Sequence, residues 1–273
     1  MTFDQTTNPR LPLWSTVRRS YASYVLSFGA VLRIARPWLV LCALLPAPAM
    51  ALRMAGQFGP AGTTAITIME HLVVSLAGVS IAVAWHRHLI LNQAAGPSVS
   101  NVLSSNLWRF TAAAVLMGLL AWLPILLTAL LPEPRFPGAI TGGEWITFAL
   151  PALLVRLVIV ALICRLCLAL PMNAINAHGL GLSASWRATR GNLMRLMLCA
   201  ASCVLLPNVL LSHLEVTIHR AILISDSGVP ILAMKPLLVL QGATNVVNLL
   251  IVPLAASFLS ITYLQLESAR GDG

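Results

Sequence analysis

Charged residues are scarce in this chain. Only 9% of its 273 residues are charged while 58% are hydrophobic, and the mean hydropathy is +0.87. Soluble domains carry about a quarter charged residues, so this composition excludes an ordinary water-soluble globular protein. The sequence therefore predicts an integral membrane protein.

Acidic residues and lysine are the rarest charges. The chain has 8 Asp+Glu against 17 Lys+Arg, and Lys235 is its only lysine. In a soluble protein the net charge of +9 would suggest nucleic acid, but here the arginines cluster between apolar runs. That distribution is typical of a protein that faces anionic lipid headgroups. We expect membrane lipids as partners and no nucleic acid.

Motifs for a known chemistry are also missing. The sequence has no His-Glu-x-x-His helix, no Walker loop and no Gly-x-Ser-x-Gly elbow. We therefore expect no enzyme, no catalytic residue, and no cofactor or metal.

Cysteine is absent from the loops, which excludes a secreted disulfide framework. Cys164 and Cys167 share a helical face, as do Cys199 and Cys203, and the four thiols could meet at one depth. One hypothesis is a four-thiolate metal or redox centre. The alternative, which we favour, is that cysteine serves here as a small apolar packing residue.

Six apolar runs are long enough to cross a bilayer, which takes about 20 helical residues each. We therefore predict an all-α, polytopic membrane helical bundle of about six transmembrane helices. The expected domains are a leader (1–36), a transmembrane domain (37–266) and a short cytoplasmic tail (267–273). The expected spans are Pro37–Leu52, His71–Leu91, Phe110–Leu131, Ile146–Pro171, Leu196–His213 and Pro236–Leu266.

The distribution of arginine predicts the orientation. Eleven of the 17 basic residues fall on one side of these spans and four on the other, with Arg156 and Arg165 inside the fourth. Because basic loops stay in the cytoplasm, we expect a multi-pass inner (plasma) membrane protein with both termini cytoplasmic.

Basic segments next to the spans predict contacts with lipid headgroups. In the leader, Trp14, Val17 and Tyr21 begin an apolar face that indicates an amphipathic interfacial helix. The cluster Trp85–His88 is expected in an interfacial belt, because its two histidines point to opposite sides of a helix and cannot chelate one metal. The candidate headgroup contacts are Arg18, Arg19, Arg33, Arg36, Arg87, Arg187, Arg190 and Arg195.

Arg156 predicts a polar site inside the membrane. It falls near the expected bilayer midplane, where a cation normally faces the bundle interior and finds a partner. No acidic residue lies in the central portion of an expected span, so the partners must be neutral. We expect Arg156 within reach of the sixth span, as an anion site or as a hydrogen-bonded link between helices. The candidate residues are Arg156, Gln241, Thr244, Asn245, Asn248 and Asn208.

Two stretches carry a family resemblance, Ala82–Leu91 and Arg165–Leu196. Within them, Trp85-His86-Arg87, Arg165 with Pro171, Ser183–Trp186, Thr189–Asn192 and Arg195 resemble a broad group of bacterial inner-membrane proteins. That group is similar to the membrane domain fused to some glycerophosphodiester phosphodiesterases and, more distantly, to Yip-type proteins. The resemblance implies a six-helix bacterial membrane protein without a settled activity, and it supplies no catalytic residue.

These observations favour a non-enzymatic function. The leading hypothesis is an accessory, scaffold or lipid-interacting membrane protein, with possible protein partners in the membrane. The alternative is a small transporter or channel with a buried anion site at Arg156. The two differ in whether Arg156 lines a water-accessible cavity or is sealed by amides.

Overall fold

All regular structure in the described part of the chain is helical. The computed structural model describes residues 10–54, 59–101, 104–129, 142–176, 182–225 and 230–271, and no strand occurs among them. In this part of the chain, six segments are long and apolar enough to cross a membrane, which confirms the predicted all-α polytopic bundle. They are Phe28–Leu52, Ala61–Leu91, Ser105–Pro124, Leu153–Ala174, Leu193–Ile222 and Pro236–Ser268.

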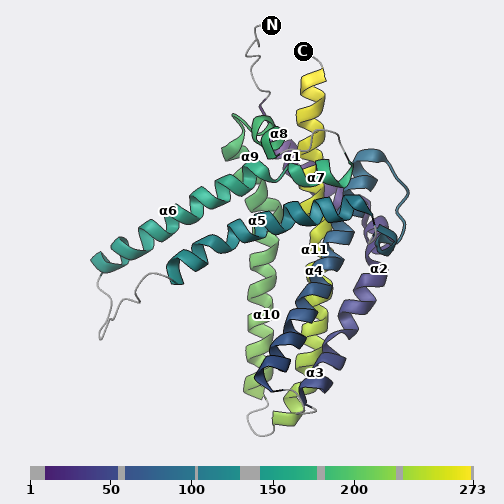
Figure 1. The fold of residues 1–273 in the computed structure, drawn as a ribbon, viewed down its shortest axis with the longest axis vertical. Coiled ribbons are helices and arrows are strands. Elements are labelled where there is room, and N and C mark those ends of the chain that lie inside the picture. Colours follow the sequence, from purple (N-terminus) through teal and green to yellow (C-terminus); the bar gives the residue numbers. More distant parts are fainter. Residues whose placement is uncertain are drawn as a thin grey trace.

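The main bundle is organised around the last helix. Helix α11 (Pro230–Gly271) runs along the long axis of the molecule beside α4 (Pro60–Leu91) and α10 (Leu206–Ser225) (Figure 1). Helix α2 (Phe28–Leu44) continues into α3 (Pro46–Met54) on the other side of α4 and α11.

The two ends of the chain lie at one end of this bundle. Helix α1 (Leu13–Leu26) and the last turns of α11 are found there, together with α7 (Ala169–Ala174), α8 (Leu182–Ala188) and α9 (Leu193–Ala200) (Figure 1). We refer to it as the terminal end, and to the opposite end, which holds α3 and the start of α11, as the far end. An even number of crossings agrees with this placement.

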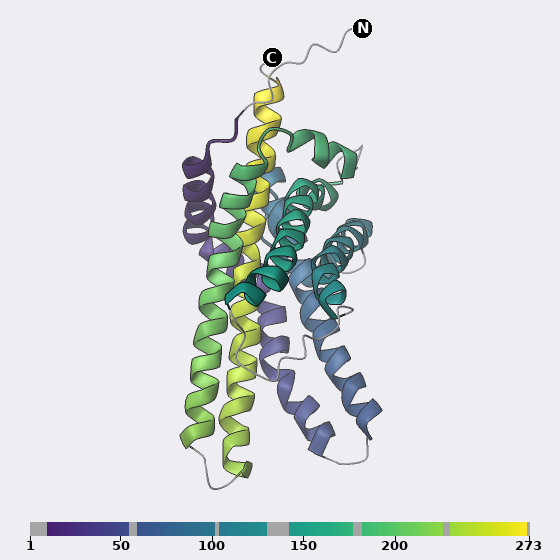
Figure 2. The same cartoon turned by 90° about the vertical axis from the view of Figure 1, so that its left-hand side faces the viewer.

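Helices α5 (Ser105–Ala129) and α6 (Gly142–Leu166) form a hairpin that projects sideways from the bundle (Figures 1 and 2). They pack against each other, α5 also contacts α7, and α6 contacts α8 and α9. Much of the hairpin surface is exposed and apolar, for example Trp122 on α5 and Val158 on α6. Such a surface suits a lipid environment.

Proline and asparagine set several helix boundaries. Pro60 occupies the first turn of α4, where no N–H partner is needed, and Asn92 ends the helix in the left-handed conformation (φ 51°). Pro46 opens α3. Pro207 follows the π-helical turn η2 (Ala201–Leu205), where the regular bonding of α9 and α10 is interrupted. A short 3-10 helix, η1 (Ser98–Asn101), precedes α5.

Several spans extend beyond their predicted ends. The first begins at Phe28 rather than Pro37, the second at Ala61 rather than His71, and the fifth ends at Ile222 rather than His213. The predictions stopped early because charged residues interrupt the apolar runs. Residues 55–58, 130–141 and 226–229, which come between successive spans, lie outside the described residues.

The leader forms the expected helix, but the side that packs against the bundle also includes polar residues outside the predicted apolar face. Helix α1 runs alongside the bundle (Figure 2) and contacts α11 and α9. Its fully buried residues are Thr16, whose hydroxyl donates to Gln265 Oε1 (2.7 Å), and Ser20. Tyr21 donates to the carbonyl of Ser202 (2.8 Å), while Trp14 is exposed. Only part of the predicted apolar face is therefore used for packing.

Candidate functional site

A groove on α2 brings two of the predicted headgroup arginines together. Arg33, Arg36 and Val40 lie on one face of the helix because they are spaced by three and four residues. With Pro37, Ala95 and Pro97 they line a cavity of about 610 Å³, which we call the basic groove. Both arginines are exposed, and neither has a hydrogen-bond or ion-pair partner among the described residues.

The wall opposite α2 is held in place by two serines. The segment after α4 returns to α2, where the Ser98 hydroxyl donates to the carbonyl of Ile34 (2.8 Å). Ser80 on α4 donates in turn to the carbonyl of Ser98 (2.9 Å). Both serine side chains are buried. The basic groove is therefore bounded by a helix and a pinned loop.

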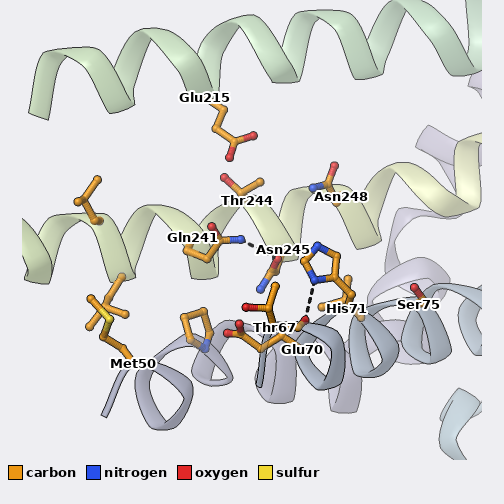
Figure 3. Close-up of a pocket in the computed structure, with 14 residues that line it drawn as sticks. Met50, Thr67, Glu70, His71, Ser75, Glu215, Gln241, Thr244, Asn245 and Asn248 are labelled. Carbon is orange, nitrogen blue, oxygen red and sulfur yellow. Dashed lines mark hydrogen bonds between the residues drawn. The ribbon is translucent and has the colours of Figure 1, made fainter. Parts of the chain in front are cut away.

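A second cavity lies toward the far end, between α3, α4, α10 and α11 (Figure 3). It measures about 540 Å³, and we call it the acidic cavity because Glu70 of α4 and Glu215 of α10 line it. None of its described lining residues is an arginine or a lysine. Its polar lining residues are Thr67, Glu70, His71, Ser75, Glu215, Gln241, Thr244, Asn245 and Asn248.

The two glutamates lie inside candidate spans but just outside the shorter spans expected from the sequence. Glu70 lies ten positions into α4, and Glu215 lies inside the candidate span Leu193–Ile222. The prediction missed them because the expected spans were cut at the charged residues themselves.

The predicted polar stripe of α11 lines the acidic cavity, and one member also joins two helices. Asn245 Nδ2 donates to the carbonyl of Cys42 on α2 (3.2 Å). In a helix that carbonyl would accept from residue 46, but Pro46 has no N–H. Gln241 Nε2 makes a long hydrogen bond to Asn245 Oδ1 (3.4 Å). Asn245 thus has a structural role.

Arg156 and Asn208 do not join this group. Arg156 is exposed on α6, which packs against α5, α8 and α9 and away from the acidic cavity. Its depth had been counted along an upright helix, but α6 projects sideways (Figure 1). Asn208 is exposed and donates to the carbonyl of Val204 (2.7 Å) on its own helix. The expected contact between Arg156 and the sixth span is therefore not formed.

The remaining headgroup candidates fall into two classes. Arg18, Arg19, Arg187 and Arg190 are exposed on α1, α8 and the turn after it. Arg87 and Arg195 are half-buried and engaged: Arg87 Nε donates to Gln93 Oε1 (2.8 Å), and Arg195 Nη1 donates to the carbonyl of Leu11 (2.9 Å).

Arg195 belongs to a clamp on the N-terminal segment. The backbone N–H of Leu11 donates to Asn192 Oδ1 (2.8 Å), so this residue is held by the turn before α9 at its N–H and by the first turn of α9 at its carbonyl. The Leu11 side chain is buried in the core beside Leu196. Nothing in the sequence pattern connected these segments, which lie far apart in the chain.

Trp85 and His86 are core residues rather than members of an interfacial belt. Their exposed fractions are 0% and 1%. Trp85 Nε1 donates to Ser257 Oγ (2.7 Å), and a hydrogen bond of 2.7 Å joins His86 Nδ1 and Ser260 Oγ. The expectation failed because it considered the neighbouring cations and not the serines of α11, which supply partners for both rings.

The cysteines of the fourth and fifth spans do come together. Cys164, Cys167, Cys199 and Cys203 are free, buried and part of one apolar core that includes Phe258. Within the described ranges, no three His, Cys, Asp or Glu side chains form a group that could hold a metal ion. Their place in an apolar core agrees with the packing interpretation, which stays a prediction.

Residues that carry the family resemblance join the end of α6 to α8. The Arg165 guanidinium lies 4.4 Å from the centre of the Trp186 ring. The hydroxyls of Ser185 and Thr189 donate to the carbonyl of Arg165 (2.7 and 3.3 Å).

Comparison with known proteins assigns neither a family nor a function to this chain. No family model, no curated protein and no solved structure matches it.

Proposed function

We propose that this protein is a non-enzymatic, lipid-interacting accessory protein of the inner membrane, and that the basic groove binds an anionic phospholipid. The observation that carries this proposal is a pair of exposed arginines, Arg33 and Arg36, next to an apolar wall inside a candidate span. Arginine binds phosphate through several donors at once, and basic pockets between membrane helices accommodate lipid headgroups.

The order of residues along α2 supports a lipid rather than a free anion. Arg33 and Arg36 come first, and Val40 follows about 6 Å further along the helix. A phosphate between the guanidinium groups would leave its acyl chains beside Pro37 and Val40. Because Ser98 and Ser80 fix the opposite wall, little ordering of the protein is needed for binding.

The structure does not support the observation on which the transporter alternative depended. It required a buried anion site at Arg156, and Arg156 is exposed on the projecting hairpin. An accessory or scaffold function, with protein partners in the membrane, agrees with the absence of a catalytic motif and with the family resemblance. The accessory or scaffold function and the protein partners in the membrane are both part of this proposal.

We further propose that both termini are cytoplasmic, because most arginines lie at the same side of the spans as the termini. Reporter fusions after Gly96 and Gly138 should give cytoplasmic and external signals, respectively. A cytoplasmic signal at Gly138 would contradict this orientation.

Lipid binding can be measured by native mass spectrometry of the full chain, released from nanodiscs of phosphatidylcholine that contain phosphatidylglycerol. We expect wild type to retain phosphatidylglycerol. The double variant Arg33→Gln/Arg36→Gln should bind it roughly tenfold to thirtyfold more weakly, since each basic residue near the surface contributes about 1 kcal/mol.

The matched control is Arg18→Gln/Arg19→Gln. It removes the same charge from two exposed arginines of α1 that do not line the basic groove. We expect a smaller loss from this pair. Equal losses from the two double variants would show that only the overall charge attracts lipid, and the groove assignment would fail.

A further inference from the structure

The acidic cavity has no part in lipid binding at the basic groove. We propose that it binds a small organic cation that carries an ammonium group. All four helices around it belong to candidate spans, so its ionisable groups lie within segments long and apolar enough to cross a membrane. Ionisable residues at such positions are costly and usually face a functional cavity.

The charge of the lining selects a cation. Glu70 and Glu215 approach from different helices, and no described lining residue is basic apart from His71. Arg220, the next cation along α10, is exposed and does not line the cavity. The Glu215 carboxylate, with no guanidinium among the described lining residues, repels an anion and favours a positively charged guest.

The hydroxyl of a largely buried threonine that lines the cavity provides a second, independent indication of a ligand. Thr244 is only 7% exposed and lines the cavity, yet its hydroxyl has no hydrogen bond to any described residue. Figure 3 shows it on the side of α11 that faces Glu215. Buried polar groups are normally satisfied, and an ammonium donor between Thr244 and Glu215 would satisfy this one.

The size and donor set distinguish an organic cation from a metal ion. The cavity volume of about 540 Å³ lies within the usual range of small-molecule sites. No group of three His, Cys, Asp or Glu side chains in the described part of the chain could hold a metal. Amide and hydroxyl oxygens from α4 and α11 can instead accept from the several N–H donors of an ammonium group.

Hydrogen bonding at the rim of the cavity involves His71 and leaves the Asn248 amide available. His71 Nδ1 is bonded to the carbonyl of Thr67 (2.8 Å), which fixes the ring against α4. Figure 3 places that ring, which belongs to α4, below Asn248 of α11. Asn248 itself makes no hydrogen bond to a described residue. The rim is thus polar and open to a guest.

The test uses the full chain in nanodiscs of phosphatidylglycerol, which contain no amine. Isothermal titration calorimetry with putrescine is compared with butanediol, a neutral molecule of similar length. We expect putrescine to bind and butanediol to bind at least about tenfold more weakly, because a charge-assisted hydrogen bond would be lost. Equal affinities would overturn the proposal.

Matched variants separate the cavity from general charge. Glu215→Gln should weaken putrescine binding about tenfold, whereas Glu267→Gln, on the exposed end of the same bundle, should not. Thr244→Val should weaken binding several-fold without lowering the unfolding temperature of the free protein, and Thr244→Ser should restore affinity. If Glu215→Gln and Thr244→Val both bind putrescine like wild type, the assignment is wrong.

Two further measurements identify the source of the amine and test whether the acidic cavity and the basic groove bind their ligands independently. Adding phosphatidylethanolamine to the nanodiscs should reduce putrescine affinity if the natural ligand is a lipid headgroup, and leave it unchanged if the ligand is a free amine. Arg33→Gln/Arg36→Gln should not alter putrescine binding. Loss of phosphatidylglycerol binding in that variant with putrescine binding intact would support both sites independently.

Discussion

Helices α4 and α11 meet in two regions that differ sharply. Toward the terminal end they form a closed seam, in which Trp85 and His86 are hydrogen-bonded to Ser257 and Ser260. Toward the far end the same helices line the acidic cavity together with α3 and α10. Both regions contain polar side chains, but in the seam Trp85 and His86 of α4 are each paired with a serine of α11.

The difference shows that polar residues in a span can be distinguished by whether their side chains have a hydrogen-bond partner within the protein. A polar group with an internal partner, such as Ser260, holds two helices together. A polar group that lines a cavity without a hydrogen bond to a described residue, such as Thr244, remains available to a ligand. Asn245 lies at the boundary, since it lines the acidic cavity and is also bonded to the backbone of α2.

The largest expected effect breaks the packing of α11 on α2 beside the cavity. A Cβ added at Gly242 would lie 2.6 Å from the carbonyl oxygen of Ala43, so a backbone must move. Gly242→Ala should therefore lower the free energy of unfolding by about 2–3 kcal/mol, despite the better helix propensity of alanine. Denaturant titration of the protein in detergent micelles measures this change.

Gly78→Ala is the matched control in the seam. There the added Cβ meets Val252 and Leu249 at 3.7 and 3.9 Å, which is ordinary van der Waals contact. We expect its stability to be unchanged or raised by up to about 1 kcal/mol. A Gly242→Ala protein as stable as Gly78→Ala would show that α2 and α11 do not approach as closely as described.

A second prediction concerns the carbonyl that Pro46 leaves without a partner. Asn245→Leu should cost about 1–2 kcal/mol of unfolding free energy, because the Cys42 carbonyl then loses its donor. Pro46→Ala supplies an N–H at the position where a regular helix would provide it. The double variant should therefore recover most of the loss.

Gln241→Leu is the control, since its only hydrogen bond is long and it is exposed. It should change stability little. If Pro46→Ala fails to rescue Asn245→Leu, the amide acts through something other than that carbonyl.

Hydropathy was sufficient to predict the architecture but not the placement of charges. The six spans follow from apolar runs that are long compared with the bilayer. Glu70 and Glu215 were missed because a charged residue lowers the local hydropathy and shortens the expected span. The helical spacing that grouped Gln241, Thr244, Asn245 and Asn248 holds in the structure, because it depends only on the geometry of one helix.

Contacts between helices could not be deduced in the same way. Arg156 was assigned to the sixth span from depth alone, and depth does not specify which helices are neighbours or how α6 is tilted. Trp85 and His86 were assigned to the headgroup layer because Arg87 follows them. The three-residue spacing of Ser257 and Ser260 on α11 was the signal that could have predicted their burial.

The smallest expected effect measures one bond of the closed seam. A double-mutant cycle of His86→Leu and Ser260→Ala isolates the hydrogen bond between the two side chains, because the loss of the His86 ring contact with Phe110 is common to both arms. Side-chain hydrogen bonds between membrane helices contribute about 0.6 kcal/mol on average, and the complete burial of both residues here favours a coupling energy of about 0.5–1.5 kcal/mol. The same cycle on Gln241 and Asn245, at the open end, should give a coupling near zero, since that bond is longer and exposed. A coupling at Gln241–Asn245 equal to that at His86–Ser260 would remove the distinction between a closed seam and an open, ligand-ready cavity.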